Sequence, residues 1–326
     1  MKEEFSEGRF TEAIQKGFVW GGGSIVFLVV LLILLQKGFL DGELSWSKIR
    51  WGWLFLGWFC MCSALMALGK RWQVLLPEYP IENSFLTASL LTALLLNYAI
   101  PGPFGEVAAS WFLQKRYNVP IEKGLVSGTA ARLIGLATAA IGVLFFWPYV
   151  DISEEISRML GIVIMGVGFG LLILGMLMFL PASLRFTLEQ RGEKSRFFKL
   201  LSRFAEAFLS LRIFHIFLLS SFWSFVGHVI AGIGVWISIY AVYGVQSGWG
   251  IGFSYLLGTC IGAIAFLFPG AQLTWDATLA LLLTTTTSLE PLEAGIMTAI
   301  LRIEQIGMML LGVISLVWIQ SRLSRS

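Results

Sequence analysis

Apolar stretches of about 20 residues recur along this chain, and they constrain its fold more than any other feature. A helix rises 1.5 Å per residue, so about 20 apolar residues cross the ~30 Å hydrocarbon core of a bilayer. Unpaired backbone groups are costly in hydrocarbon, so spanning stretches of this kind must be helical. Only 13% of the 326 residues are charged and 57% are hydrophobic, which is typical of a polytopic membrane protein.

We therefore expect an all-α membrane fold with about eight transmembrane helices. Their expected ranges are 18–36, 51–69, 84–100, 125–146, 159–180, 213–243, 252–268 and 292–320. Two further helical segments, residues 104–116 and 273–287, are too short to cross the core. Each short segment directly follows a span, so we expect each to form a re-entrant half-helix hairpin with that span. The hairpins are centred on residues 101–116 and 269–287.

Two Pro-Gly breaks separate the short segments from the spans before them. Proline lacks an amide donor and glycine disfavours helix, so both breaks interrupt the backbone ladder. Irregular backbone at membrane depth is tolerated only within protein or beside water. Broken helices at corresponding positions of two halves are typical of transporter binding sites. We predict hinges formed by Pro101, Gly102, Pro103, Gly105, Pro269 and Gly270.

The two halves carry the same features in the same order. Each break is followed by an acidic residue, a proline and an arginine: Glu106, Pro120 and Arg132, then Asp276, Pro291 and Arg302. Basic residues favour the cytoplasmic side, and a cytoplasmic N-terminus makes the hairpins enter from opposite faces. This predicts an inverted repeat, with chance agreement in apolar sequence as the alternative.

The charge pattern also predicts orientation and domain boundaries. Lys70-Arg71, Lys115-Arg116 and a basic linker fall on one side if both termini are cytoplasmic, as expected in an inner (plasma) membrane. No cleavage site follows the N-terminal arm, so we expect the first apolar segment to be an anchor. The expected parts are the arm 1–17, a first membrane half 18–181, an amphipathic linker 182–212 and a second half 213–326.

Four charged residues are expected near the membrane midplane. Arg132 lies about ten residues into its span, ~15 Å deep, where an unpaired arginine costs at least ~2.5–3.5 kcal/mol. Two interpretations stay open. Ion pairs of Glu106 with Arg132 and Asp276 with Arg302 could only hold the hairpins in place. Alternatively, the arginines line a polar cleft and receive an anionic group such as a lipid phosphate.

Two amides join this set. Asn97 precedes the first break by four residues, and it could satisfy freed backbone groups or line the cleft. Gln305 shares a helix face with Arg302, whereas Glu304 faces another side. The candidate substrate-binding residues are therefore Glu106, Arg132, Asp276, Arg302, Asn97 and Gln305.

Other chemistry finds little support in the sequence. There is no Gly-rich phosphate loop, zinc-type histidine pair or nucleophile–base constellation. Cys60, Cys62 and Cys260 lie in apolar runs and are expected to be buried hydrophobes. No catalytic residue, metal or cofactor is expected, and a net charge of +3 is too small to indicate nucleic acid.

The segments around the first break carry a family resemblance. Pro101-Gly102-Pro103-Phe104-Gly105-Glu106, followed by residues 128–136, resembles the transmembrane domain of lysylphosphatidylglycerol synthetases. Residues 269–276 are similar to that family's second Pro-Gly segment, and the resemblance covers residues 19–320. The chain departs from the family pattern at Ala131, Gly135 and the 271–273 stretch, and Trp275 stands where a basic residue is common.

The resemblance implies a flippase part that moves a phospholipid, often aminoacylated, between leaflets. It implies a stand-alone member without the aminoacyl-transferase domain, so we expect no synthetase activity. We predict a flippase-like transporter, not an enzyme, whose substrate is an anionic or aminoacylated phospholipid or another lipid-linked phosphate. Protonation of Glu106 or Asp276 could couple transport to protons.

Two alternative functions stay open. One is a membrane-embedded enzyme acting on a lipid phosphate, and the other is a non-catalytic partner of a lipid-synthesis enzyme. A homo-oligomer also stays open.

Overall fold

The computed structural model describes residues 47–99, 104–178, 214–244, 248–265 and 271–324, with the single positions 33, 36 and 206. The expected arm 1–17 lies outside these ranges. So do all but two residues of the first span, all but one of the linker, and the hinge residues Pro101, Gly102, Pro103, Pro269 and Gly270.

Nine α-helices and one short 3-10 helix make up the described part of the chain, which contains no strand. The all-α prediction is therefore confirmed. The helices of the first half are α3 (Trp51–Val74), α4 (Asn83–Ala99), α5 (Phe104–Tyr117), α6 (Ile121–Phe146), η1 (Trp147–Tyr149) and α7 (Glu154–Met178). Those of the second half are α10 (Phe214–Tyr243), α11 (Gly248–Ala265), α12 (Ala271–Thr286) and α13 (Pro291–Leu323).

The helices begin and end close to the expected positions, with one difference that matters for the site. The sequence predicts that the second span ends at residue 69, but α3 continues to Val74. Lys70 and Arg71 therefore lie inside the helix instead of in a loop. Local signals account for other boundaries: Asn118, with φ 54°, follows the last residue of α5, and Pro120 precedes α6. A residue in this left-handed region commonly ends a helix.

Four described helices are long and apolar enough to cross a membrane, namely α3, α6 with η1, α10 and α13. The outer surface of α7 is also apolar, with Met165 and Phe169 largely exposed, as expected for side chains that face lipid. The chain is a multi-pass membrane protein. The number of spans and the re-entrant path of the short helices stay predictions.

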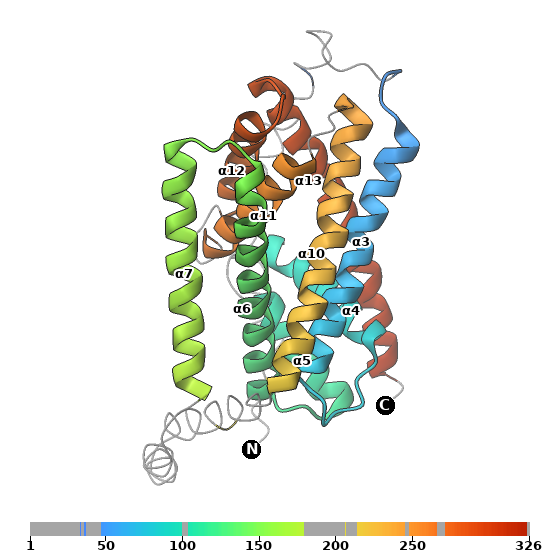
Figure 1. Ribbon diagram of the computed structural model, residues 1–326. Helices are drawn as coiled ribbons and strands as arrows, with labels where there is room; N and C mark the ends of the chain where they lie inside the picture. Colours follow the sequence, from blue (N-terminus) through green and yellow to red (C-terminus); the bar gives the residue numbers. More distant parts are fainter. Residues whose placement is uncertain are drawn as a thin grey trace.

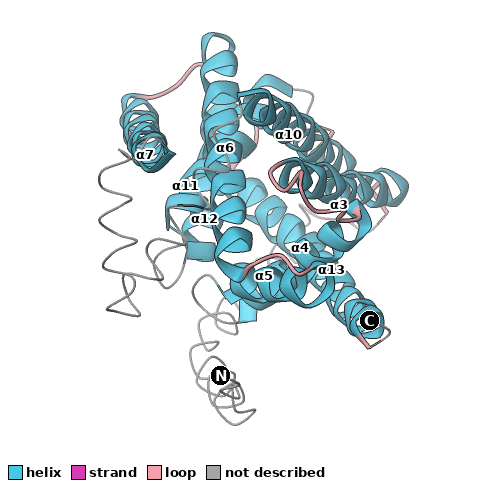
Figure 2. Cartoon of the chain, turned by 90° about the horizontal axis from the view of Figure 1, so that it is seen from below, coloured by secondary structure: helices cyan, strands magenta, loops and turns pink. Residues whose placement is uncertain are grey.

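The two pairs of short helices occupy opposite ends of the molecule. Figure 1 shows α4 and α5 in the lower half and α11 and α12 in the upper half. The long helices that follow them run in opposite directions, α6 upward and α13 downward. The view from below in Figure 2 places α3 beside α10 and α4 beside α13. Helices that are distant in sequence thus pack side by side.

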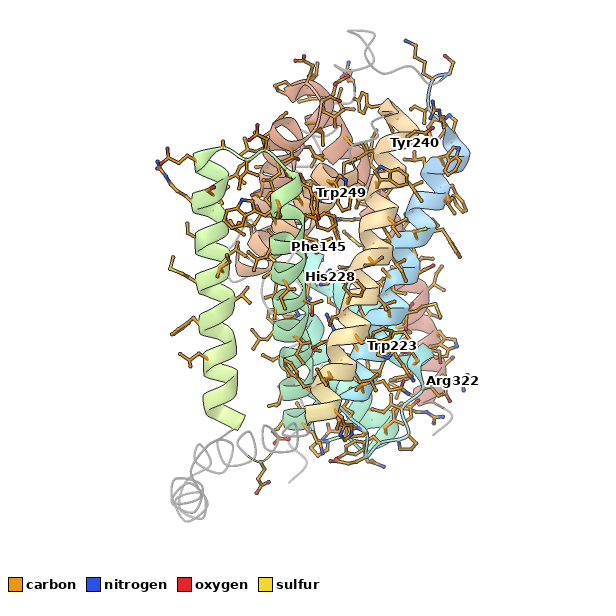
Figure 3. The ribbon with its side chains drawn as sticks, viewed as in Figure 1. Phe145, Trp223, His228, Tyr240, Trp249 and Arg322 are labelled. Atoms are coloured by element: carbon orange, nitrogen blue, oxygen red, sulfur yellow. The ribbon has the colours of Figure 1, made fainter. Side chains whose placement is uncertain are left out.

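Aromatic side chains mark the upper end of the bundle. Tyr149 stacks on Trp249 with ring centroids 4.9 Å apart, and Phe146 lies against the same indole. Figure 3 shows Trp249 and Tyr240 in the upper part of the molecule and Arg322 near its lower end. Aromatic residues near one end and a basic residue at the other fit a molecule whose ends lie at the two membrane interfaces.

Candidate functional site

The first break is flanked by a cluster of polar contacts between α4, α5 and α6. The Asn97 amide nitrogen donates to Glu106 Oε1 over 3.1 Å, and its carbonyl oxygen accepts the Gly105 amide at 2.7 Å. Arg132 forms an ion pair with the same Glu106 oxygen. Asn97 therefore satisfies an amide at the start of α5, where helix N–H groups have no partner within the helix. It also orients the carboxylate that receives Arg132.

The second break has a matching cluster on α12 and α13. Arg302 donates from Nη2 to Asp276 Oδ1 over 2.6 Å and from Nη1 to Gln305 Oε1 over 2.6 Å. Its guanidinium also lies over the Trp275 ring, 5.3 Å from the centroid. The two ion pairs expected from the sequence are thus present. Both join residues 26 positions apart in the chain.

The two clusters differ sharply in exposure. The side chains of Arg302 and Asp276 are only 3% and 7% exposed, whereas that of Arg132 is 43% exposed. The Arg302 guanidinium is held by a carboxylate, an amide and an indole, so its charge is balanced although the side chain is buried. Arg132 can be reached from outside the protein. The six predicted residues therefore form two groups. The group around the exposed Arg132 is accessible, and the group around the buried Arg302 is enclosed: Asn97, Glu106 and Arg132, then Asp276, Arg302 and Gln305.

Sequence reasoning missed a third arginine. Arg71 is 9% exposed on α3, and its Nε has no hydrogen-bond partner among the residues described. Within the described part of the chain, no carboxylate pairs with its guanidinium, and its charged neighbour is another cation, Arg132. Positive-inside reasoning placed Arg71 at the cytoplasmic end of a span. Only the extension of α3 and the packing around it show that the side chain is enclosed.

The Arg71 guanidinium lies against the middle of α6. A Cβ built on Gly135 would meet Arg71 Nη1, so a side chain at that position would displace the guanidinium. His228 of α10 bonds the Gly135 carbonyl through Nε2 at 3.0 Å, and Figure 3 shows this histidine at mid-height on α10. Helical side chains lean toward the N-terminus of their helix. This direction carries the Arg71 guanidinium away from the lower end of α3 and toward the centre of the bundle.

Together these residues form what we call the first-half site: Arg71, Arg132, Glu106, Asn97 and Gly135. It holds two guanidinium groups and one carboxylate, so it carries one more positive than negative charge. A desolvated cation near other cations is unfavourable unless an anion joins it. Guanidinium forks match the oxygens of phosphate groups. The site can therefore receive an anionic group such as a phosphodiester.

Gly105 has a packing role besides any hinge role. In the first turn of α5, its Cβ position would meet the Ala93 carbonyl of α4, so only glycine lets the two helices approach this closely. The cysteines agree with the expectation of apolar burial: Cys260 is buried, and Cys60 and Cys62 are partly buried. Among the described residues, no three His, Cys, Asp or Glu side chains gather where they could hold a metal ion.

A family model described as "Lysylphosphatidylglycerol synthase TM region" matches residues 19–312. No curated protein and no solved structure matches the chain. The matched range includes all five residues of the first-half site and both ion pairs.

Proposed function

The chain belongs to the lysylphosphatidylglycerol synthase transmembrane family, and from that premise we propose that it is a lipid translocase. In this proposal an anionic lipid headgroup enters the first-half site and crosses the membrane centre while the acyl chains stay in lipid. The substrate is a phospholipid, aminoacylated or not, or another lipid-linked phosphate. The protein works as a transporter, without chemical change of the lipid.

The observation that carries the proposal is the buried Arg71 with no carboxylate among the described residues to balance it. An unpaired arginine at membrane depth costs at least ~2.5–3.5 kcal/mol. A structural arginine would be expected to have a partner of the kind that Arg302 has in Asp276. A phosphate that bridges Arg71 and the accessible Arg132 would supply the missing charge in charge-assisted hydrogen bonds.

The second cluster has a different role in this proposal. Arg302 is bound by Asp276, Gln305 and Trp275, so in this conformation the pair holds α12 against α13. Two observations support an inverted repeat with re-entrant short helices. Each half carries an ion pair of the same spacing, and the short helices lie at opposite ends of the molecule (Figure 1). Rocking of one half against the other would then open the first-half site to each leaflet in turn.

Leaflet exchange in proteoliposomes tests the proposal. The purified chain is reconstituted with labelled phosphatidylglycerol, lysylphosphatidylglycerol and phosphatidylcholine, beside Arg71→Gln. We expect wild-type exchange to depend on the headgroup and to fall about tenfold or more in Arg71→Gln, as for loss of one charge-assisted bond. The matched control is Arg158→Gln, an exposed arginine at the start of α7, which should exchange lipid at the wild-type rate.

Measurements of thermal stability distinguish a lipid-binding role of Arg71 from a role in holding the fold together. Removing an unbalanced buried charge should leave the fold as stable as before or more stable, so Arg71→Gln should melt at or above the wild-type temperature. Gly135→Ala keeps the charge but takes the space of Nη1, and it should also lose exchange. Gly161→Ala, whose Cβ meets nothing within 4 Å, is its control. If Arg71→Gln unfolds the protein, or exchanges lipid normally, the proposed site is wrong.

The alternative functions predict other results. A lipid-modifying enzyme would release a chemically altered lipid in detergent, where no second leaflet exists. A non-catalytic partner would show no exchange of any lipid while folded. Either result would overturn the translocase proposal.

A further inference from the structure

Among the residues that the structure describes, no cation balances one buried carboxylate of the second half. Glu304 lies on α13, 13 residues after Pro291 and therefore about 20 Å along this helix, and it is 7% exposed. Its neighbours come from α3 and α10, which pack along each other. Asp276 and Glu106 are both ion-paired. Glu304 forms no salt bridge within the described part of the chain.

Within the described part of the chain, a single hydroxyl, that of Ser238, serves both oxygens of the Glu304 carboxylate. Ser238 Oγ lies 2.9 Å from Oε1 and 3.2 Å from Oε2. A hydroxyl has a single proton, so it can donate fully to only one of these oxygens. The Trp58 indole donates to the backbone carbonyl of Glu304 at 2.9 Å, and not to its side chain. An ionised carboxylate would thus be poorly satisfied, whereas a protonated one supplies its own donor.

Charged and titratable groups on α13, α3 and α10 lie against other partners or carry no charge, and Arg71 of α3 lies against Gly135 of α6. On α13 itself, Arg302 binds Asp276 and Gln305. From α3, Cys62 lies within electrostatic range of Glu304, but a thiol supplies no positive charge. On α10, His228 bonds the Gly135 carbonyl, and Tyr240 lies under the Arg50 guanidinium.

These contacts favour a proton over a metal ion as the partner of Glu304. The described site offers one carboxylate and one hydroxyl, and Trp58 occupies the adjacent backbone oxygen. Cations such as Ca²⁺ and Mg²⁺ take six or more oxygen ligands, far more than these two side chains supply. A single proton on the carboxylate removes the buried charge completely.

We propose that Glu304 is the proton-binding site that couples lipid translocation to the proton gradient. This inference rests on the proposed translocase function. Protonated Glu304 keeps α13 packed against α3 and α10. Release of the proton leaves a charge that demands water, so α13 must separate from these helices while Glu304 is ionised. Because α13 also carries Arg302, which holds α12, this separation moves the α12–α13 pair relative to α3 and α10.

The first test measures proton binding without requiring transport. Infrared spectra of the purified protein at neutral pH should contain a carboxylic-acid C=O band that is absent in Glu304→Gln. Glu304→Asp keeps an acid and should keep a band at a shifted frequency. Glu154→Gln, which changes an exposed carboxylate at the start of α7, should leave the spectrum of wild type unchanged. A spectrum in which Glu304→Gln removes no acid band would overturn the assignment.

The second test measures coupling in proteoliposomes. If one proton moves with each lipid, a gradient of one pH unit should concentrate the labelled lipid about tenfold in one leaflet. Glu304→Gln, shown to be folded by its melting temperature, should lose this response, and Glu154→Gln should keep it. An unaltered response in Glu304→Gln would refute coupling through this residue. If wild type moves no lipid at all, the translocase proposal fails, whereas the infrared result still decides whether Glu304 binds a proton.

Discussion

At the scale of single residues, three buried or half-buried arginines meet different environments. Arg302 has a carboxylate, an amide and an aromatic face, Arg132 shares one carboxylate with Asn97, and Arg71 has no carboxylate among the described residues. An arginine whose charge is balanced by a carboxylate stabilises a helix pair, whereas an unbalanced one is costly until an anion arrives. We therefore expect Arg302 to serve the packing of α12 and α13 and Arg71 to serve the binding of an anion.

The enclosed pair yields a stability prediction. Arg302→Gln leaves Asp276 buried without its cation, and removing one partner of a buried pair costs about 3–5 kcal/mol. The free energy of unfolding, measured by denaturant titration in detergent, should fall by that amount. Arg158→Gln breaks only an exposed i,i+4 pair and should change it by no more than about 0.5 kcal/mol. Equal effects of the two substitutions would show that the Arg302 pair contributes little.

At the scale of helices, close backbone approach decides which elements touch. Gly57 of α3 lies where a Cβ would meet Ser238 Oγ and come within 2.8 Å of the Gly234 carbonyl on α10. Small residues at such crossings let membrane helices pack closely in the absence of a hydrophobic driving force. The α3–α10 crossing also places Ser238 beside Glu304 of α13. The packing of α3 on α10 therefore helps to determine which groups contact α13.

Two glycine substitutions, one at this crossing and one on the open surface of α7, should have opposite effects on stability. Gly57→Ala must push against backbone atoms of α10, and overpacking of this kind costs about 1–3 kcal/mol. Gly168→Ala on α7 meets nothing within 4 Å and should stabilise its helix by about 0.5–1 kcal/mol. Thermal unfolding in detergent should therefore place the two variants on opposite sides of wild type. A stable Gly57→Ala would mean that α3 and α10 are less tightly packed than described.

At the scale of the whole molecule, the two halves repeat the order of short helix, short helix and long helix. The lengths are 17, 14 and 26 residues for α4, α5 and α6, and 18, 16 and 33 for α11, α12 and α13. The long helices run in opposite directions (Figure 1). The ends of the two short-helix pairs should accordingly face opposite sides of the membrane.

Cysteine labelling tests this arrangement. In a background without Cys60, Cys62 and Cys260, Lys115→Cys marks the end of α5 and Ser288→Cys marks the α12–α13 connection. A membrane-impermeant maleimide should label Ser288→Cys from outside intact cells and Lys115→Cys only in inside-out vesicles. Labelling of both from the same side would contradict the inverted arrangement.

The sequence by itself determined much of this protein. Its apolar runs specify helices because lipid leaves the backbone no other partner, and its prolines, with Asn118, set several ends. The ion pairs of Arg132 and Arg302 could be expected because buried charges need partners. The tertiary structure alone decided the rest. Arg71 is enclosed because α3 extends past residue 69 against Gly135. Glu304 is buried beside α3 and α10 with no salt-bridge partner among the described residues. Whether a charged side chain is buried, and whether an opposite charge lies beside it, depends on which helices pack together although they are distant in sequence. Local sequence patterns do not specify that packing.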